Sequence, residues 1–168
     1  MKMNTIVSYF LIVSSLFGLI STNTPRVRTG DLQLLTGPQW TGTLTYLDYR
    51  TNKKVSIPSN LSVRQSSEDK LSWAFEYQYP DEPKANNKDI VTISKDGRTI
   101  DGETVIERTN LSGNVLKIVT EKSGSDNDKK AMFRYTYLIG SKSFTIKKEV
   151  RYEGATEFLE RNQYLWKR

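Results

Sequence analysis

The side chains that could carry out acid–base chemistry in this chain are carboxylates, lysines and tyrosines, because the sequence contains no histidine. Histidine is the usual general base and a common metal ligand, so its absence excludes Ser-His-Asp and Cys-His arrangements and most zinc and non-haem iron sites. Six glutamates fall on predicted strands: Glu76, Glu103, Glu107, Glu149, Glu157 and Glu160. Most of them alternate with apolar residues, which is typical of an outward, solvated face. We therefore assign no catalytic residue, and an enzyme is the less favoured interpretation.

Cysteine is absent as well, which excludes disulfide bonds, thiolate nucleophiles and zinc–thiolate sites. The sequence has no glycine-rich phosphate-binding loop followed by a helix. Residues 125–128 carry oxygen ligands, but they lack the spacing and the closing glutamate of a calcium-binding loop. We expect no metal site and no cofactor.

Aromatic side chains at alternate positions form a second group of candidate functional residues. Two sets each share one face of a predicted strand: Trp73, Phe75 and Tyr77 in one, Phe133, Tyr135 and Tyr137 in the other. If these faces point into a barrel, they either fill it or line a pocket. We predict that they form a site for a small, largely apolar molecule. Lys148 and Asn162 share faces with other aromatic residues and are candidates for the polar groups that orient a ligand.

The elements that would position these residues are β-strands, because apolar residues recur with a period of two from residue 34 onward. The pattern predicts about nine strands, over residues 39–49, 54–64, 71–79, 89–94, 103–108, 114–121, 131–139, 144–152 and 157–167. Turn residues at 95–98, 110–113, 123–127 and 140–141 indicate antiparallel neighbours. Closing such a sheet on itself removes its edges. We therefore expect an all-β fold, an antiparallel up-and-down barrel of about 8–10 strands, with a β-sandwich as the alternative.

The segment Leu34-Leu35-Thr36-Gly37-Pro38-Gln39-Trp40-Thr41-Gly42 resembles the entry to the first strand of lipocalin-like (calycin) barrels. In that family a tryptophan plugs one end of the barrel beneath a basic side chain from the last strand. The resemblance implies that Gly37 and Trp40 take these positions, with either Arg161 or Arg168 as the cation. A guanidinium over an indole ring is a favourable contact. Gly37 and Trp40 are separated by two residues, where one is usual in the family.

The N-terminal stretch resembles a secretory signal. Lys2 is followed by an apolar run of about 15 residues and then by small polar residues. We predict a signal peptide over residues 1–22, a flexible lead-in over 23–32, and a single lipocalin-like barrel domain over 33–168. The protein is then exported, to the periplasm or outside the cell, with no stable insertion in the membrane once the signal is removed. An uncleaved N-terminal membrane anchor is the alternative.

The formal net charge is +6, but the basic residues are scattered and most have acidic neighbours. Nucleic-acid binding would require a basic cluster on one face or a recognisable module, so we expect no nucleic-acid partner. Three functions remain open. The first is a non-catalytic binding protein for a small apolar ligand; the second is a structural or interaction protein of the cell envelope with a filled barrel. The third is a barrel enzyme of the isomerase or cyclase type that uses carboxylate, tyrosine or lysine groups.

Overall fold

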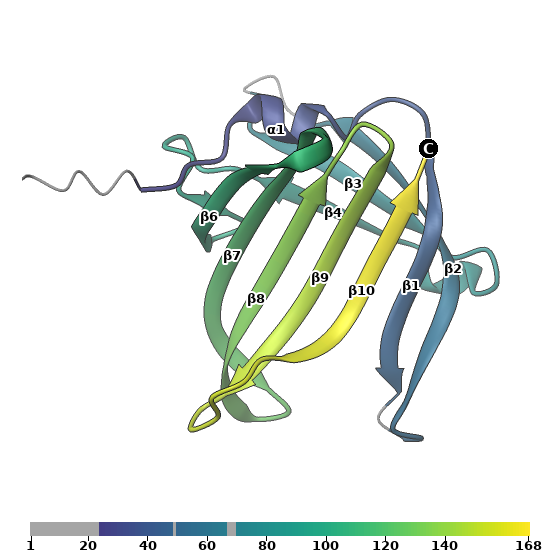
Figure 1. The fold of residues 1–168 in the computed structure, drawn as a ribbon. Helices are drawn as coiled ribbons and strands as arrows, with labels where there is room; N and C mark the ends of the chain where they lie inside the picture. Colours follow the sequence, from purple (N-terminus) through teal and green to yellow (C-terminus); the bar gives the residue numbers. More distant parts are fainter. Residues whose placement is uncertain (1–23, 49, 67–69) are drawn as a thin grey trace, which may run out of the picture.

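The computed structural model describes residues 24–48, 50–66 and 70–168. These residues contain ten strands in one antiparallel sheet (Figure 1). The strands are β1 (Trp40–Asp48), β2 (Lys53–Gln65), β3 (Ser72–Gln78), β4 (Asn87–Thr92), β5 (Thr99–Ile100), β6 (Glu103–Leu111), β7 (Val115–Asp126), β8 (Lys129–Ile139), β9 (Ser143–Tyr152) and β10 (Leu159–Lys167). Three short helices accompany them: α1 (Thr29–Gln33), η1 (Pro83–Ala85) and η2 (Ser112–Asn114).

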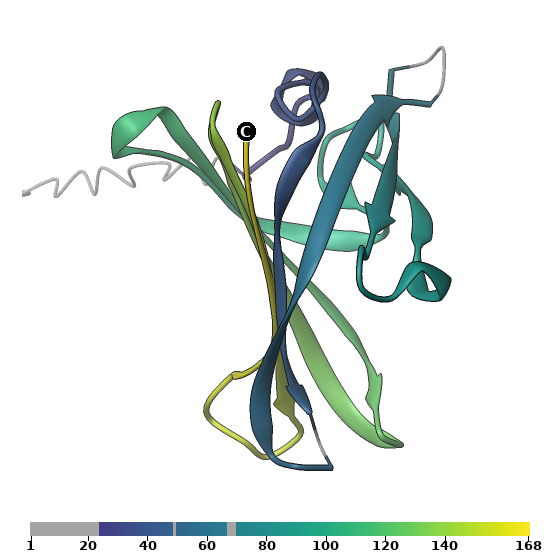
Figure 2. The same ribbon diagram turned by 90° about the vertical axis from the view of Figure 1, so that its right-hand side faces the viewer.

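The sheet curls into a nearly closed barrel. Almost every strand pairs with its neighbours in the chain, and the last strand pairs with the first, from Thr41↔Lys167 to Tyr46↔Asn162. The remaining gap, between β4 and β5, is bridged at Ile93↔Ile100. Figure 2 shows β2, β3 and β4 facing the β7–β10 part of the sheet across the interior. The predicted up-and-down barrel is confirmed, and the sandwich is wrong because all ten strands belong to one sheet.

Alternation of apolar residues identifies nine of these strands within a few residues. It misses β5, because two residues are too few to show a period. The turn predicted at 123–127 lies later in the chain: β7 continues to Asp126, and Asn127 and Asp128 form the turn with φ of 49° and 61°. Two successive positive φ angles fit the right-handed twist of a two-residue hairpin, and asparagine and aspartate tolerate them.

The end of the barrel nearest α1, called here the α1 end, is filled by aromatic side chains. Trp40, Phe144 and Trp166 are each 0% exposed. The Phe144 ring lies 6.1 Å from that of Trp40 and stacks on that of Trp166 at 5.3 Å between centroids. Such ring pairs stabilise the fold by more than the burial of their apolar area alone. This end of the interior is a packed core.

Part of the predicted lead-in packs on this core through Val27 and Leu32. Val27 and Leu32 are 4% and 1% exposed, and α1 lies across the α1 end of the barrel (Figure 1). A helix of five residues is too short to show apolar periodicity, which explains why the sequence did not reveal it. The predicted signal peptide over residues 1–22 lies outside the described residues.

Candidate functional site

A cavity of about 520 Å³, open to solvent where its lining residues Asn87, Asp89 and Asp101 are exposed, lies beyond this packed core, between β3–β4 on one side and β8–β10 on the other. Its wall combines aromatic and aliphatic side chains with charged and amide groups. The lining residues are Phe75, Tyr77, Asn87, Asp89, Ile90, Val91, Asp101, Glu103, Tyr135, Tyr137, Ile146, Lys148, Asn162 and Tyr164. The volume falls within the usual range for small-molecule pockets.

Four of the six aromatic residues predicted to bind a ligand line this cavity: Phe75, Tyr77, Tyr135 and Tyr137. Trp73 is 0% exposed and belongs to the packed core. Phe133 lies beside Lys148, whose Nζ is 5.0 Å from the centre of its ring. Lys148 and Asn162, the two candidate orienting residues, both line the cavity. That these residues bind a ligand stays a prediction.

Tyrosine rings separate the cavity from the core. The Tyr164 ring stacks on Trp166 at 4.7 Å and lies 5.5 Å from Tyr77. The hydroxyl groups of Tyr164 and Tyr79 are hydrogen-bonded at 2.8 Å. These contacts fix the floor of the cavity, so a ligand would meet a preformed aromatic surface.

Three carboxylates on the cavity wall were not among the candidate ligand-binding residues. Asp89 pairs with Phe75 across β3 and β4, and Asp101 and Glu103 come from the turn and the strand that follow β5. Glu103 is 9% exposed, so the outward orientation expected for it is wrong. One signal for its orientation was present: Val105, two residues along the same strand, is 2% exposed and shares its face.

Burial raises the pKa of Glu103 above its usual value, and the nearby negative charge of Asp101 adds to this effect. A hydrogen bond from Thr120 and the charges of Lys122 and Lys148 act in the opposite direction. Burial is also the first cause of the raised pKa of Asp101. Each shift means that the folded protein favours the protonated acid relative to water.

Replacing Glu103 with glutamine is therefore expected to stabilise the protein at pH 7. A raised pKa gives stability that is fully present below the unfolded value, near 4.5, and is lost as the pH rises through the folded value. The glutamine side chain is neutral at every pH, so the variant retains this stability at pH 7. The Tm at pH 7 should therefore rise, by about 2–4 °C for each kcal/mol gained. The gain should disappear in melts at pH 4, whereas a lower Tm at pH 7 would contradict this assignment.

A second hollow, of about 470 Å³, adjoins the cavity and shares Lys148 and Asn162 with it. Arg161 lines this hollow, at the far end of the barrel from α1, where its guanidinium bonds to the Asp126 carboxylate and the Tyr152 hydroxyl. The Tyr152 hydroxyl in turn donates to Asp126 at 2.6 Å. Arg161 therefore does not lie on Trp40.

Arg168 is the cation that covers Trp40, with Cζ 4.0 Å from the centre of the indole ring. Its Nη1 and Nη2 donate to the carbonyl oxygens of Thr36 and Leu34, both at 2.9 Å. Gly37 has φ of +119°, and a Cβ atom there would lie 3.3 Å from Nη1 of Arg168. Trp40 Nε1 donates to the Leu35 carbonyl at 2.8 Å. These bonds close the α1 end.

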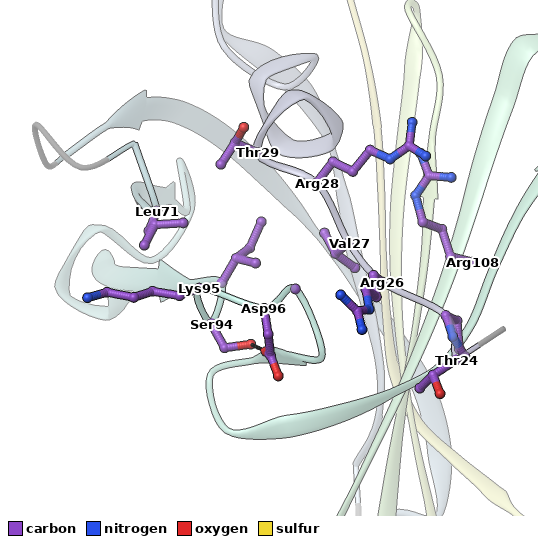
Figure 3. Close-up of a pocket in the computed structure, with 13 residues that line it drawn as sticks. Thr24, Arg26, Val27, Arg28, Thr29, Leu71, Ser94, Lys95, Asp96 and Arg108 are labelled. Atoms are coloured by element: carbon purple, nitrogen blue, oxygen red, sulfur yellow. Dashed lines mark hydrogen bonds between the residues drawn. The ribbon is translucent and has the colours of Figure 1, made fainter.

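A third hollow, of about 510 Å³, lies on the seam between the lead-in and the turn after β4 (Figure 3). The backbone N–H of Val27 donates to the Gly97 carbonyl at 2.8 Å. Asp96 accepts a hydrogen bond from Ser94, and Arg108 is bound to Asp31 of α1. The lining residues Arg26 and Arg28 are exposed. Because its charged groups are either solvated or engaged within the protein, we assign no ligand to this hollow.

The part of the chain that the structure describes holds no group of three or more acidic side chains placed to bind a metal ion. Among the same residues, no helix is long and apolar enough to cross a membrane.

Comparisons with known proteins give little further information. No protein-family model matches the chain, and no curated protein matches it. A crystal structure of a protein of unknown function from the DUF3598 family of Nostoc punctiforme matches with 11% sequence identity and a TM-score of 0.39. The match covers 86% of this chain and 50% of the other, so this chain spans about half the length of that protein. A likeness at this level assigns neither a family nor a function.

Proposed function

We propose that this chain is an exported, lipocalin-like binding protein that holds a small ligand with a largely apolar body in its barrel and performs no covalent chemistry on it. The observation that carries the proposal is the divided interior. The α1 end is packed solid around Trp40, whereas a cavity of about 520 Å³ with a tyrosine floor occupies the space beyond it.

Two further features support a lipocalin-like protein. The last strand pairs with the first, and Arg168, directly after the last strand, covers Trp40 of the first. A barrel of this size is where lipocalins accommodate one small ligand. The cavity also favours a binding protein over a filled barrel that acts only through its surface, because such a barrel needs no empty interior.

The first experiment is a titration with N-phenyl-1-naphthylamine, a neutral aromatic probe whose fluorescence rises in an apolar site. We expect saturable binding, with energy transfer from Trp166, which stacks on the cavity residue Tyr164. Native mass spectrometry of the protein from its own host would then show whether a natural ligand is present.

Asn162→Phe is the variant that tests the location of the probe, since Asn162 lines the cavity and phenylalanine would fill part of it. We expect its affinity for the probe to fall at least about tenfold. Gln163→Phe is the matched control, because the next residue along β10 points to the opposite face of the sheet. It should bind the probe as the unmodified protein does. Equal binding by both variants, or no saturable binding at all, would overturn the proposal.

A further inference from the structure

The charge of the cavity wall is opposite to that of the protein. The chain carries a formal net charge of +6, yet three carboxylates and one ammonium group line the cavity: Asp89, Asp101, Glu103 and Lys148. A wall of one predominant charge in a partly desolvated cleft attracts ligands of the other charge. This wall therefore favours a cation.

The three carboxylates have bonding capacity to spare. Glu103 accepts a hydrogen bond from Thr120 at 2.5 Å, and Asp101 accepts one from the backbone N–H of Thr92 at 2.7 Å. Asp89 accepts one from the neighbouring Asn87. Within the described part of the chain, none of the three forms a salt bridge. Since an ionised carboxylate can accept about four hydrogen bonds, each retains room for a donor from a ligand.

A tyrosine hydroxyl on the cavity wall also has hydrogen-bonding capacity for a ligand. Tyr137 is 9% exposed and lines the cavity, and no residue among those described makes a hydrogen bond to its hydroxyl. A polar group on a ligand would supply one here.

A cation already lies over aromatic rings at the cavity: Lys148 and Tyr135 line it, and Phe133 lies beside Lys148. The Lys148 ammonium lies 5.6 Å from the centre of the Tyr135 ring and 5.0 Å from that of Phe133. These distances are within the range of cation–π attraction. Because Lys148 already lies over these two rings, recognition of a ligand's positive charge falls to the carboxylates.

We propose that the ligand is an organic cation: an aromatic or aliphatic body that rests on the tyrosine floor and bears a protonated amine that bonds to the acidic wall formed by Glu103, Asp101 and Asp89. This inference rests on the proposed function and specifies its ligand class. A bare metal ion fits less well, because the described residues contain no cluster of three acidic groups close enough to coordinate one. A ligand's ammonium needs only one of these carboxylates as a direct partner, so the three need not converge on one point.

The test compares three ligands that share one ring system and differ in charge: 1-naphthylmethylamine, 1-naphthalenemethanol and 1-naphthoate. Isothermal titration at pH 7.5 should show that the amine binds about tenfold or more tightly than the alcohol, the effect expected from one charge-assisted hydrogen bond. The naphthoate should bind most weakly. The preference for the amine should decline as the pH falls and the carboxylates are protonated.

Glu103→Gln should reduce affinity for the amine about tenfold and leave that for the alcohol unchanged. Glu107→Gln on the same strand is the control, because Glu107 is paired with Lys117 outside the cavity. Far-UV circular dichroism would verify that both variants are folded. Equal affinity for all three ligands, or tighter binding of the naphthoate, would overturn the cation assignment while the binding function stands. Failure of every ligand and of N-phenyl-1-naphthylamine would overturn both.

Discussion

Replacing Gly42 with alanine is expected to break the pairing that closes the barrel. Gly42 lies on β1 opposite Trp166 of β10. A Cβ atom at this position would lie 2.0 Å from the Leu165 carbonyl oxygen and 2.7 Å from the Trp166 Cα atom. Both are backbone atoms, so no side-chain rotation relieves the clash. The two strands must separate, and the ring stack around Trp166 must shift with them.

The loss should be at least about 3 kcal/mol, the upper part of the range for overpacked cores. For a chain of this size that corresponds to a fall in Tm of about 6–12 °C. Thermal melts followed by tryptophan fluorescence would measure it, because the β1–β10 seam carries Trp40 and Trp166. Gly30→Ala is the matched control: nothing lies within 4 Å of a Cβ atom there, and its stability should hardly change. A Gly42→Ala protein with the same Tm as the wild type would show that β1 and β10 are not in this register.

The sequence predicted most of the fold because burial on one face of a strand leaves a direct trace in residue order. The alternation of Trp73, Phe75 and Tyr77 requires no tertiary information, and these side chains do point inward. Short elements leave no such trace, which is why α1 and β5 were missed. A polar residue on an inward face is missed for another reason. Glu103 shares one face with Val105, but Ile106 is apolar on the opposite face, so the paired sheet was needed to show that the Val105 face is the buried one.

The candidate site was less predictable because alternation gives the face of a residue but not its height along the barrel. Trp73 and Tyr135 both point inward, yet Trp73 lies in the core and Tyr135 lines the cavity. Alternation also could not show whether Arg161 or Arg168 covers Trp40, because that depends on the register between strands. The β9–β10 register shifts between Glu160 and Asn162, so Arg161 lies at a bulge. Bulges re-aim a side chain independently of the pattern on either side.

The ion pair between Asp31 and Arg108 was also hidden from the sequence, since 77 residues separate its members. The Asp31 carboxylate accepts hydrogen bonds from Nε and Nη2 of Arg108 at 2.8 and 2.7 Å, and a third from the backbone N–H of Arg28. Asp31 is 6% exposed. The pair connects α1 to β6 and so holds the helix across the end of the barrel.

Asp31→Asn should lower the free energy of unfolding by about 3 kcal/mol, because it leaves the guanidinium of Arg108 partly buried without its counter-charge. Combining it with Arg108→Met should recover much of this loss, since the uncompensated charge is then gone. Urea unfolding of both single variants and the double variant gives the coupling energy directly.

The exposed pair Lys54–Glu160 provides the comparison, with side chains 64% and 30% exposed. Glu160→Gln should change stability by less than about 1 kcal/mol, as is usual for a surface salt bridge. If Asp31→Asn cost no more than this, the bidentate pair would not hold α1 on the barrel. The segment around α1 would then be held by the burial of Val27 and Leu32 and by the bonds of Arg168 to the Leu34 and Thr36 carbonyls.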